Sequence, residues 1–342
     1  MTPGEEVTVA DETSLVSSRR VILLVILSMV VFALVGWYGR FDEVMTALSS
    51  IPWYFVLPAM MALSLLNYII RYAKWQYFLR RIDVNIPHSD SFAIFLAGFT
   101  LTATPGKIGE AIKGYFIRDI DGTPIAKTVP VVISERVTDL LALVILAVLG
   151  FALGISAGDE LLSVLLLGGA VFGAAIVLGS GTFYNKILAK LTSVGPLKRF
   201  QYSCDIIEGT MTGTLSPRPM LLTTAISVPG WFMECLELWL LLTLLAGSSL
   251  SPIILLLSAT FVHATASVIG ALTFSPGGVG TYEVTSVVLL TVILGVTTPI
   301  ASAATILIRV VTLWFSVVVG FVALAVVNRR DRKRKHESIH QS

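Results

Sequence analysis

LTATPGKIG at residues 101–109 and LTFSPGGVG at residues 272–280 are two copies of one pattern, L-T-x-(T/S)-P-G-x-(I/V)-G. They align without gaps at an offset of 171 residues, which is half of the 342-residue chain. A glutamate follows each copy, Glu110 in one case and Glu283 in the other. Internal similarity at this spacing indicates two related halves, each with an interrupted apolar region.

The chemistry of these residues predicts that both copies break a helix. Proline lacks an N–H and stops helix continuation, while glycine accepts a positive φ and lets another backbone approach. Because unsatisfied backbone groups cannot face lipid, a break must be buried in protein or line a wet cavity. Ordinary tight turns between spanning helices are the alternative. The broken-helix motifs comprise Pro105, Gly106, Gly109, Pro276, Gly277, Gly278 and Gly280.

The composition places these motifs in a membrane protein. Hydrophobic residues make up 55% of the chain and charged residues only 13%, with a mean hydropathy of +0.84, whereas a soluble chain is usually about 25% charged. A water-soluble enzyme, a disordered protein and a nucleic-acid binder all fit poorly. The two cysteines, Cys204 and Cys235, encode neither a disulfide framework nor a zinc site.

The apolar stretches predict an all-α polytopic fold. Six are long enough to cross about 30 Å of hydrocarbon, and they begin near Val21, Trp53, Val131, Leu161, Met220 and Ile300. Two more, at about 90–120 and 253–295, are split by the Pro-Gly motifs into helical hairpins, either re-entrant or paired. Counting the crossings between the halves gives an odd number, so we expect six full transmembrane helices and two split hairpins in an inverted repeat.

The distribution of Lys and Arg sets the orientation. With the N-terminus inside, 21 of the 24 basic residues fall on inner segments, Arg40 falls in an outer loop, and two lie within spans. Since cytoplasmic loops collect positive charge, we expect a multi-pass protein of the cell membrane with both termini in the cytoplasm.

The same reading divides the chain into segments. We expect a disordered N-terminus, a membrane domain built from two halves with an amphipathic linker between them, and a basic cytoplasmic tail. The N-terminus comprises residues 1–18, the membrane domain 19–328 and the tail 329–342. Within the membrane domain, the halves lie at about 53–156 and 219–328 and the linker at 183–217.

Eight ionisable groups lie within or beside the apolar spans. If they faced lipid they would together cost roughly 20–28 kcal/mol on the insertion scale, so they must face the interior, pair or snorkel. They are candidates for lining or gating a substrate cavity: Glu110, Glu135, Arg136, Asp139, Glu234, Glu237, Glu283 and Arg309. The alternative is structural, with the two arginines clamping the breaks through Glu110 and Glu283.

Three further polar residues are candidates for contact with a lipid headgroup, namely Asn67, Arg71 and Lys107. Arg71 shares a helix face with Asn67 near the inner surface, where it can touch a phosphate or snorkel. His263 is expected to be a hydrogen-bonded core histidine.

The order of N-Y-x-x-R at 67–71, T-P-G-K-I-G-E at 104–110, E-R-x-x-D at 135–139 and S-P-G-G-V-G-T-Y-E at 275–283 resembles the lysylphosphatidylglycerol synthase transmembrane region, or flippase-like domain family. The resemblance covers about residues 20–328. In the bacterial multiple peptide resistance factor such a domain moves aminoacylated phosphatidylglycerol to the outer leaflet, and a separate soluble domain makes that lipid. Because this chain ends fourteen residues after Asn328, the resemblance implies transport without lysyl transfer.

Three functions are therefore weighed. The first is a carrier that translocates a lipid or a lipid-linked polar headgroup between leaflets; the lipid would be anionic, aminoacylated or polyprenyl-linked. The second is an integral-membrane lipid-modifying enzyme, for which Asp119 and Asp121 are the residues to test. The third is an accessory subunit of a lipid or glycan pathway. We expect no enzymatic activity, no cofactor, no metal and no nucleic acid, and a second copy or a lipid-synthesising enzyme as the protein partner.

Overall fold

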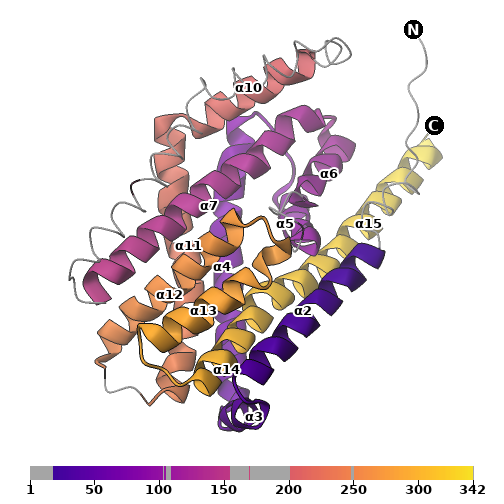
Figure 1. Cartoon of the computed structure of the whole chain (residues 1–342). Coiled ribbons are helices and arrows are strands. Elements are labelled where there is room, and N and C mark those ends of the chain that lie inside the picture. Colours follow the sequence, from indigo (N-terminus) through magenta and orange to yellow (C-terminus); the bar gives the residue numbers. More distant parts are fainter. Residues whose placement is uncertain are drawn as a thin grey trace.

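The computed structural model describes residues 18–102, 104, 109–154, 169, 201–247 and 250–341, and within these ranges the chain forms helices and no β-strand. The elements of the first half are α2 (Ser18–Tyr38), α3 (Phe41–Ser49), α4 (Trp53–Arg81), α5 (His88–Ala97), η1 (Gly98–Leu101), α6 (Ile112–Asp121) and α7 (Ile125–Gly154). The others are α10 (Gln201–Leu215), α11 (Pro217–Leu245), α12 (Pro252–Leu272), η4 (Pro276–Gly278), α13 (Thr281–Val292), α14 (Thr298–Arg309), η5 (Val310–Trp314) and α15 (Phe315–Gln341). Figure 1 shows them as one bundle of long helices.

Five of the described helical stretches are long and apolar enough to cross a membrane: α4, α7, α11, α12 and the combined stretch Thr298–Arg332. A sixth is possible if α2 and α3, which meet at a bend of 97°, form one broken span. The crossings predicted near Trp53, Val131, Met220 and Ile300 correspond to helices in this set. The predicted crossing near Leu161 lies outside the described residues.

The two split regions differ from each other in length. In the first, α5 and α6 have 10 residues each, too few to span about 30 Å at 1.5 Å per residue. In the second, α12 has 21 residues and α13 has 12. The second region is thus not a pair of matched arms, because the apolar run of 252–272 has no proline after its first residue and continues as one full-length helix.

Other predicted segments are only partly covered. Residues 1–17, 155–168 and 170–200 lie outside the described residues, and with them residues 183–200 of the predicted linker, while the last part of that linker forms α10. α15 continues as helix into the basic stretch that begins at 329, as far as Gln341.

Short polar signals explain where several helices begin. α11, α12 and α14 each follow a serine or threonine and carry proline at one of their first two positions. Proline is favoured there because the first helical N–H groups have no intrahelical partner. Ser251 also caps α12 by accepting a hydrogen bond from the Ile254 N–H at 3.4 Å.

The two halves interlock through close helix contacts at glycine. α7 packs along α12, where a Cβ at Gly150 would lie 2.6 Å from the backbone oxygen of Leu257. α15 packs on α5 and η1, where a Cβ at Gly320 would lie 2.3 Å from the backbone nitrogen of Thr100. The last long helix of each half therefore packs against helices of the split region of the other half (Figure 1).

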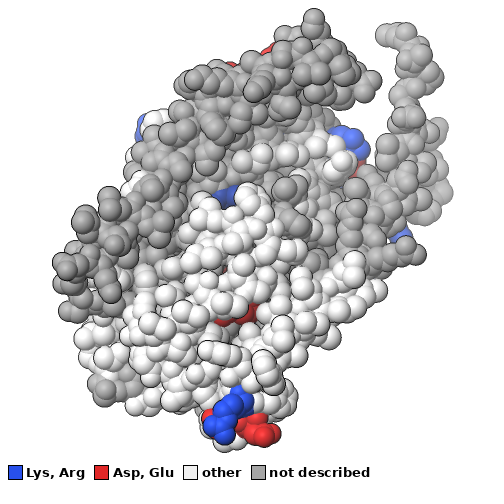
Figure 2. Space-filling view, viewed as in Figure 1, with Lys and Arg blue, Asp and Glu red and all other residues white. Residues whose placement is uncertain are grey.

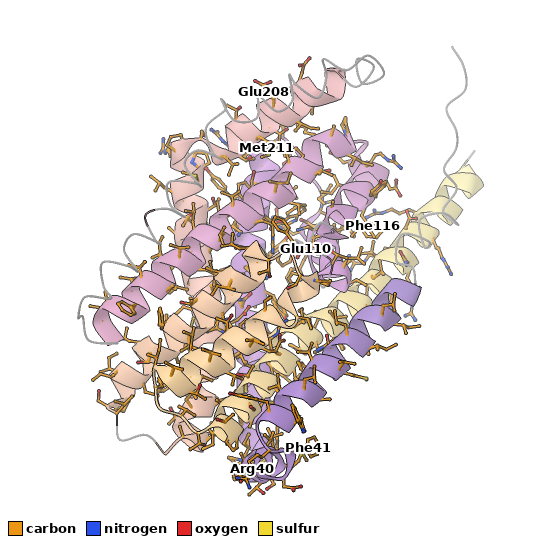
Figure 3. All side chains as sticks on the ribbon, viewed as in Figure 1. Arg40, Phe41, Glu110, Phe116, Glu208 and Met211 are labelled. Carbon is orange, nitrogen blue, oxygen red and sulfur yellow. The ribbon has the colours of Figure 1, made fainter. Side chains whose placement is uncertain are left out.

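The described surface and interior differ as a membrane protein requires. On the face shown in Figure 2 the described surface is mostly uncharged, and charged side chains gather at the end formed by α3. Figure 3 places Arg40 and Phe41 at that end and Glu110 inside the bundle, consistent with a Glu110 side chain that is fully buried. Charged groups away from the ends are thus turned inward.

Candidate functional site

The second break is formed by glycines with positive φ, and an ion pair binds its exposed backbone groups. Gly277, Gly278 and Gly280 have φ values of 62°, 74° and 89°, a left-handed backbone that residues with a Cβ rarely adopt. Arg309 donates from Nη2 to the Gly277 carbonyl at 2.7 Å and from Nε to Glu283 Oε1 at 2.7 Å. Glu283 Oε2 in turn accepts from the Gly280 N–H at 2.6 Å. The arginine and the glutamate therefore satisfy backbone groups that the break exposes.

The first break carries the corresponding pair. Arg136 Nη2 lies 3.4 Å from Glu110 Oε2, and Thr102 donates to Glu110 Oε1 at 2.8 Å. The N–H of Gly109 donates to Thr104 at 2.9 Å. Pro105, Gly106 and Lys107 lie outside the described residues.

The two ion pairs occupy equivalent positions in the sequence. Glu110 and Arg136 are 26 residues apart, and so are Glu283 and Arg309. In each case the glutamate follows the break and the arginine comes from the next long helix. The structural role foreseen for the arginines is therefore present in both halves, and it supports the relationship indicated by the repeated motif.

Around the first break, buried charges form a larger cluster. Asp139 Oδ1 lies 2.5 Å from Lys74 Nζ, and Asp139 Oδ2 lies 3.2 Å from Arg136 Nη2. Lys113 Nζ lies 2.6 Å from Glu135 Oε2 and 3.6 Å from Glu110 Oε2. Such pairing offsets the cost of removing these charges from water.

Lys74 and Lys113 are both fully buried, although the count of basic residues assigned them to cytoplasmic segments. Their positions on helices could have indicated that they pair with buried acids. Lys74 comes seven residues before Arg81, the end of α4, and Lys113 stands three residues after Glu110 on the same face.

Arg71 completes this cluster but is poorly satisfied. Its side chain is 5% exposed, and its Nη2 lies 3.8 Å from Asp139 Oδ2, too far for a hydrogen bond. Neither Nε nor Nη2 has a hydrogen-bond partner among the described residues. The guanidinium instead lies near the rings of Phe99 and Trp231, at 5.3 and 5.7 Å from their centroids.

A second polar group forms around α11. Glu234 Oε2 lies 3.2 Å from His263 Nε2, and His263 Nδ1 forms a hydrogen bond with the Tyr282 hydroxyl at 2.9 Å. Asn67 donates to Glu234 Oε1 at 3.1 Å and to the Gly230 carbonyl at 2.8 Å. His263 is buried and hydrogen-bonded, as expected, but no sequence pattern indicated that Glu234 would be its acidic partner.

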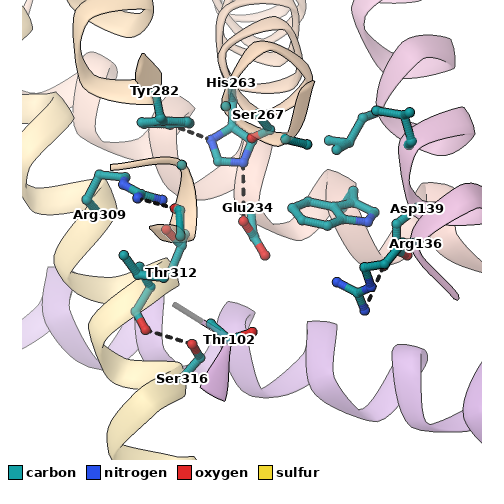
Figure 4. A pocket seen from close by; sticks show the side chains of 18 of the residues that line it. Thr102, Arg136, Asp139, Glu234, His263, Ser267, Tyr282, Arg309, Thr312 and Ser316 are labelled. Carbon is teal, nitrogen blue, oxygen red and sulfur yellow. Dashed lines mark hydrogen bonds and ion pairs between the residues drawn. The ribbon is translucent and has the colours of Figure 1, made fainter. Parts of the chain in front are cut away.

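One cavity of about 330 Å³ lies between these groups. Both split regions contribute to its wall, through Thr102 and Thr104 on one side and Ser275, Gly277 and Gly278 on the other. Figure 4 shows Arg136 and Asp139 facing Glu234, His263 and Arg309 across this space. Its rim includes the exposed apolar residues Leu272 and Phe274.

The cavity separates the predicted site residues into two groups. Arg71, Arg136, Asp139, Glu234, Gly277, Gly278 and Arg309 line it. Asn67, Gly109, Glu110, Glu135, Glu237, Pro276, Gly280 and Glu283 are not among its described lining residues. Of the second group, Glu110 and Glu283 contact the lining arginines Arg136 and Arg309, and Asn67 contacts Glu234.

Comparison with known proteins gives two results. The family model for the lysylphosphatidylglycerol synthase TM region matches residues 25–320. Similar proteins include the UPF0104 membrane protein MJ1595 of Methanocaldococcus jannaschii, 22% identical over 336 residues that cover 93% of this chain and 98% of that protein. The UPF0104 membrane protein PH1989 of Pyrococcus horikoshii is 22% identical over 333 residues, covering 90% of this chain and 97% of that protein.

Proposed function

The chain belongs to the lysylphosphatidylglycerol synthase transmembrane family, and from its interior we propose that it is a carrier that moves the headgroup of a lipid or lipid-linked compound between leaflets. The observation that carries the proposal is a cavity whose wall includes residues of both split regions. Broken helices that meet at a shared polar site are the arrangement through which many carriers handle substrate.

The size of the cavity fits a headgroup better than a whole lipid. Pockets that enclose small ligands measure about 300–1,000 Å³, and this one, at about 330 Å³, lies at the lower end. Acyl or polyprenyl chains must therefore remain outside the polar space. The exposed apolar residues Leu272 and Phe274 at the rim offer a surface along which such chains can stay in contact with lipid.

The chemistry of the wall favours a headgroup that contains phosphate. Arg71 lines the cavity, two of its nitrogens have no hydrogen-bond partner among the described residues, and guanidinium groups bind phosphate through paired N–H donors. Arg136, 20% exposed at its side chain, adds a second cation. Anionic, aminoacylated and polyprenyl-linked lipids all share the phosphate that this site would bind.

We infer that the two halves are inverted with respect to each other. The equivalent Glu–Arg pairs, each 26 residues apart, and the reciprocal packing of α7 on α12 and α15 on α5 support two like modules. In inverted repeats, rocking of one module against the other exposes a central site to each side in turn. The positive-inside bias supports a carrier of the cell membrane with both termini in the cytoplasm.

The proposal includes no covalent step. Asp119 and Asp121, the residues weighed for a lipid-modifying enzyme, do not line the cavity. Asp119 lies 3.8 Å from Arg118, and Asp121 accepts a hydrogen bond from Thr123 at 2.5 Å. The proposed binding partner of this site is the lipid substrate itself.

The test is lipid movement by the purified protein in proteoliposomes that contain trace phosphatidylglycerol labelled on an acyl chain. A membrane-impermeant quencher reports the fraction in the outer leaflet over time. The wild-type protein should accelerate exchange, and Arg71→Gln should slow it about 10- to 150-fold, as expected for loss of a charged hydrogen bond of about 1.5–3 kcal/mol. Arg80→Gln, an exposed arginine on the same helix, is the matched control. No protein-dependent exchange of any phosphate-containing lipid would overturn the proposal.

A further inference from the structure

Glu237 is a buried acid that the cavity does not use. Its side chain on α11 is fully buried and does not belong to the described cavity wall. Oε1 lies 2.8 Å from the Ser64 hydroxyl, whereas Oε2 has no hydrogen-bond partner among the described residues. The position therefore needs an explanation beyond substrate contact.

No cation balances this carboxyl within the described part of the chain, where none of the ion pairs includes Glu237. Glu283 makes the contrast clear, since it is equally buried but has Arg309 at 2.7 Å. An isolated ionised carboxylate in an apolar interior costs so much free energy that the group normally becomes neutral instead. Glu237 is thus suited to hold a proton.

The other titratable groups near α11 do not change this conclusion. α11 packs against α4, α7, α10, α12 and α14. The buried titratable groups that these helices and α11 itself contribute are Tyr68, Arg71, Lys74, Glu135, Asp139, Glu234, Cys235, His263 and Arg309. Among the basic members, Lys74 contacts Asp139, His263 contacts Glu234 and Arg309 contacts Glu283, while Arg71 lies 3.8 Å from Asp139, and none of them pairs with Glu237. The charged group on the same face of α11, Glu234, is another acid and opposes a negative charge at Glu237.

A proton on Oε1 of Glu237 joins the hydrogen bonds on that side of the carboxyl into one series. A protonated carboxyl can donate to Ser64, and the Ser64 hydroxyl can then donate to the Val311 carbonyl at 3.5 Å. Val311 lies in η5, a π-helical turn, and such turns often occur at functional sites. With the proton present, donors and acceptors form one chain from α11 through α4 to η5.

A titratable route joins this site to the cavity. Glu234 stands three residues before Glu237, close to one helical turn, and lines the cavity. It pairs with His263, which is bonded to Tyr282, and both of these residues also face the cavity (Figure 4).

On this geometry we propose that Glu237 binds the proton that drives the carrier and that Glu234, held by His263, transfers this proton between Glu237 and cavity water. The proposal rests on the transport function proposed above. A hydronium ion in the cavity gives its proton to the Glu234 carboxylate, which passes it to the Glu237 carboxylate, so only O–H bonds form and break. Neutral Glu237 favours the closed interior, while ionised Glu237 favours a state that admits water, so the proton shifts the conformational population.

The first test reads the proton without any transport. Infrared difference spectra of the purified protein over a pH series should contain the carbonyl stretch of a buried protonated carboxyl. That band should disappear in Glu237→Gln, shift in Ser64→Ala, which removes only the hydrogen bond, and persist in Glu43→Gln, an exposed control. A spectrum in which Glu237→Gln or, if that variant does not fold, Ser64→Ala leaves all carboxyl bands unchanged would overturn the assignment.

The second test measures coupling in the same proteoliposomes. With one proton per lipid, a gradient of about one pH unit supports about a tenfold ratio of labelled lipid between leaflets at steady state, and the ratio should invert when the gradient is reversed. Glu237→Gln should give the same ratio with and without the gradient. If wild-type protein moves lipid but ignores the pH gradient, or follows a sodium gradient instead, the proton site is wrong and the carrier stands. If it moves no lipid, the carrier itself is wrong.

Discussion

Replacing Arg309 by glutamine tests the role of the clamp at the second break. The change removes the partner of Glu283 at 2.7 Å and the donor to the Gly277 carbonyl at 2.7 Å, leaving a carboxylate that is fully buried. Breaking a buried ion pair in this way costs about 3–5 kcal/mol. At about 2–4 °C per kcal/mol, the melting temperature should fall by roughly 6–20 °C.

The assay is thermal unfolding of purified protein in detergent, followed by circular dichroism. Arg40→Gln is a matched control, because Arg40 and Glu43 are only 2.6 Å apart but their side chains are 79% and 44% exposed. Loss of an exposed pair costs less than about 1 kcal/mol. Equal melting temperatures for the two variants would refute the view that burial, rather than pair distance, gives the clamp its strength.

Substitutions at five further positions test the packing and the charge network. Lys74→Met leaves buried Asp139 without its closest cation and should cost about 3–5 kcal/mol, whereas the double change with Asp139→Leu should recover part of that loss in detergent melts. Gly320→Ala places a Cβ 2.3 Å from the backbone of η1 and should lower the melting temperature, while Gly209→Ala, in open space on α10, should raise stability by about 0.5–1 kcal/mol. Asp90→Asn removes ion pairs to two arginines of α15 that are 43% and 42% exposed, so its loss of about 1 kcal/mol should shrink when melts are repeated at high salt.

Part of the architecture could be predicted from the repeated motif. Because Pro and Gly restrict or release the backbone in known ways, the sequence indicated a break at residues 276–280, and three glycines there do adopt positive φ. The need to pair buried charge gave, as the alternative to a cavity role, the contacts of Arg136 and Arg309 with Glu110 and Glu283 that the structure contains. These features depend on local chemistry and can be read from one chain.

Other features depend on tertiary packing and could not be predicted. The absence of proline within 253–272 allows one full-length helix, but the helices on which it packs, here α7 and α11, are decided by tertiary contacts. Glu234 and Glu237 looked alike in sequence, yet one faces the cavity and the other faces Ser64. Hydropathy does not distinguish the surroundings of two residues that lie one helical turn apart.

Photo-crosslinking from inside the cavity tests most directly whether the lipid headgroup passes through it. A photoreactive amino acid is placed at Ser267, which lines the cavity on α12, and the protein is irradiated in liposomes that contain acyl-labelled phosphatidylglycerol while it catalyses exchange. The account predicts a lipid adduct at the headgroup, absent when the same amino acid replaces the exposed Thr243 and reduced by Arg71→Gln. Exchange that proceeds without any adduct at Ser267 would contradict passage of the headgroup through this cavity.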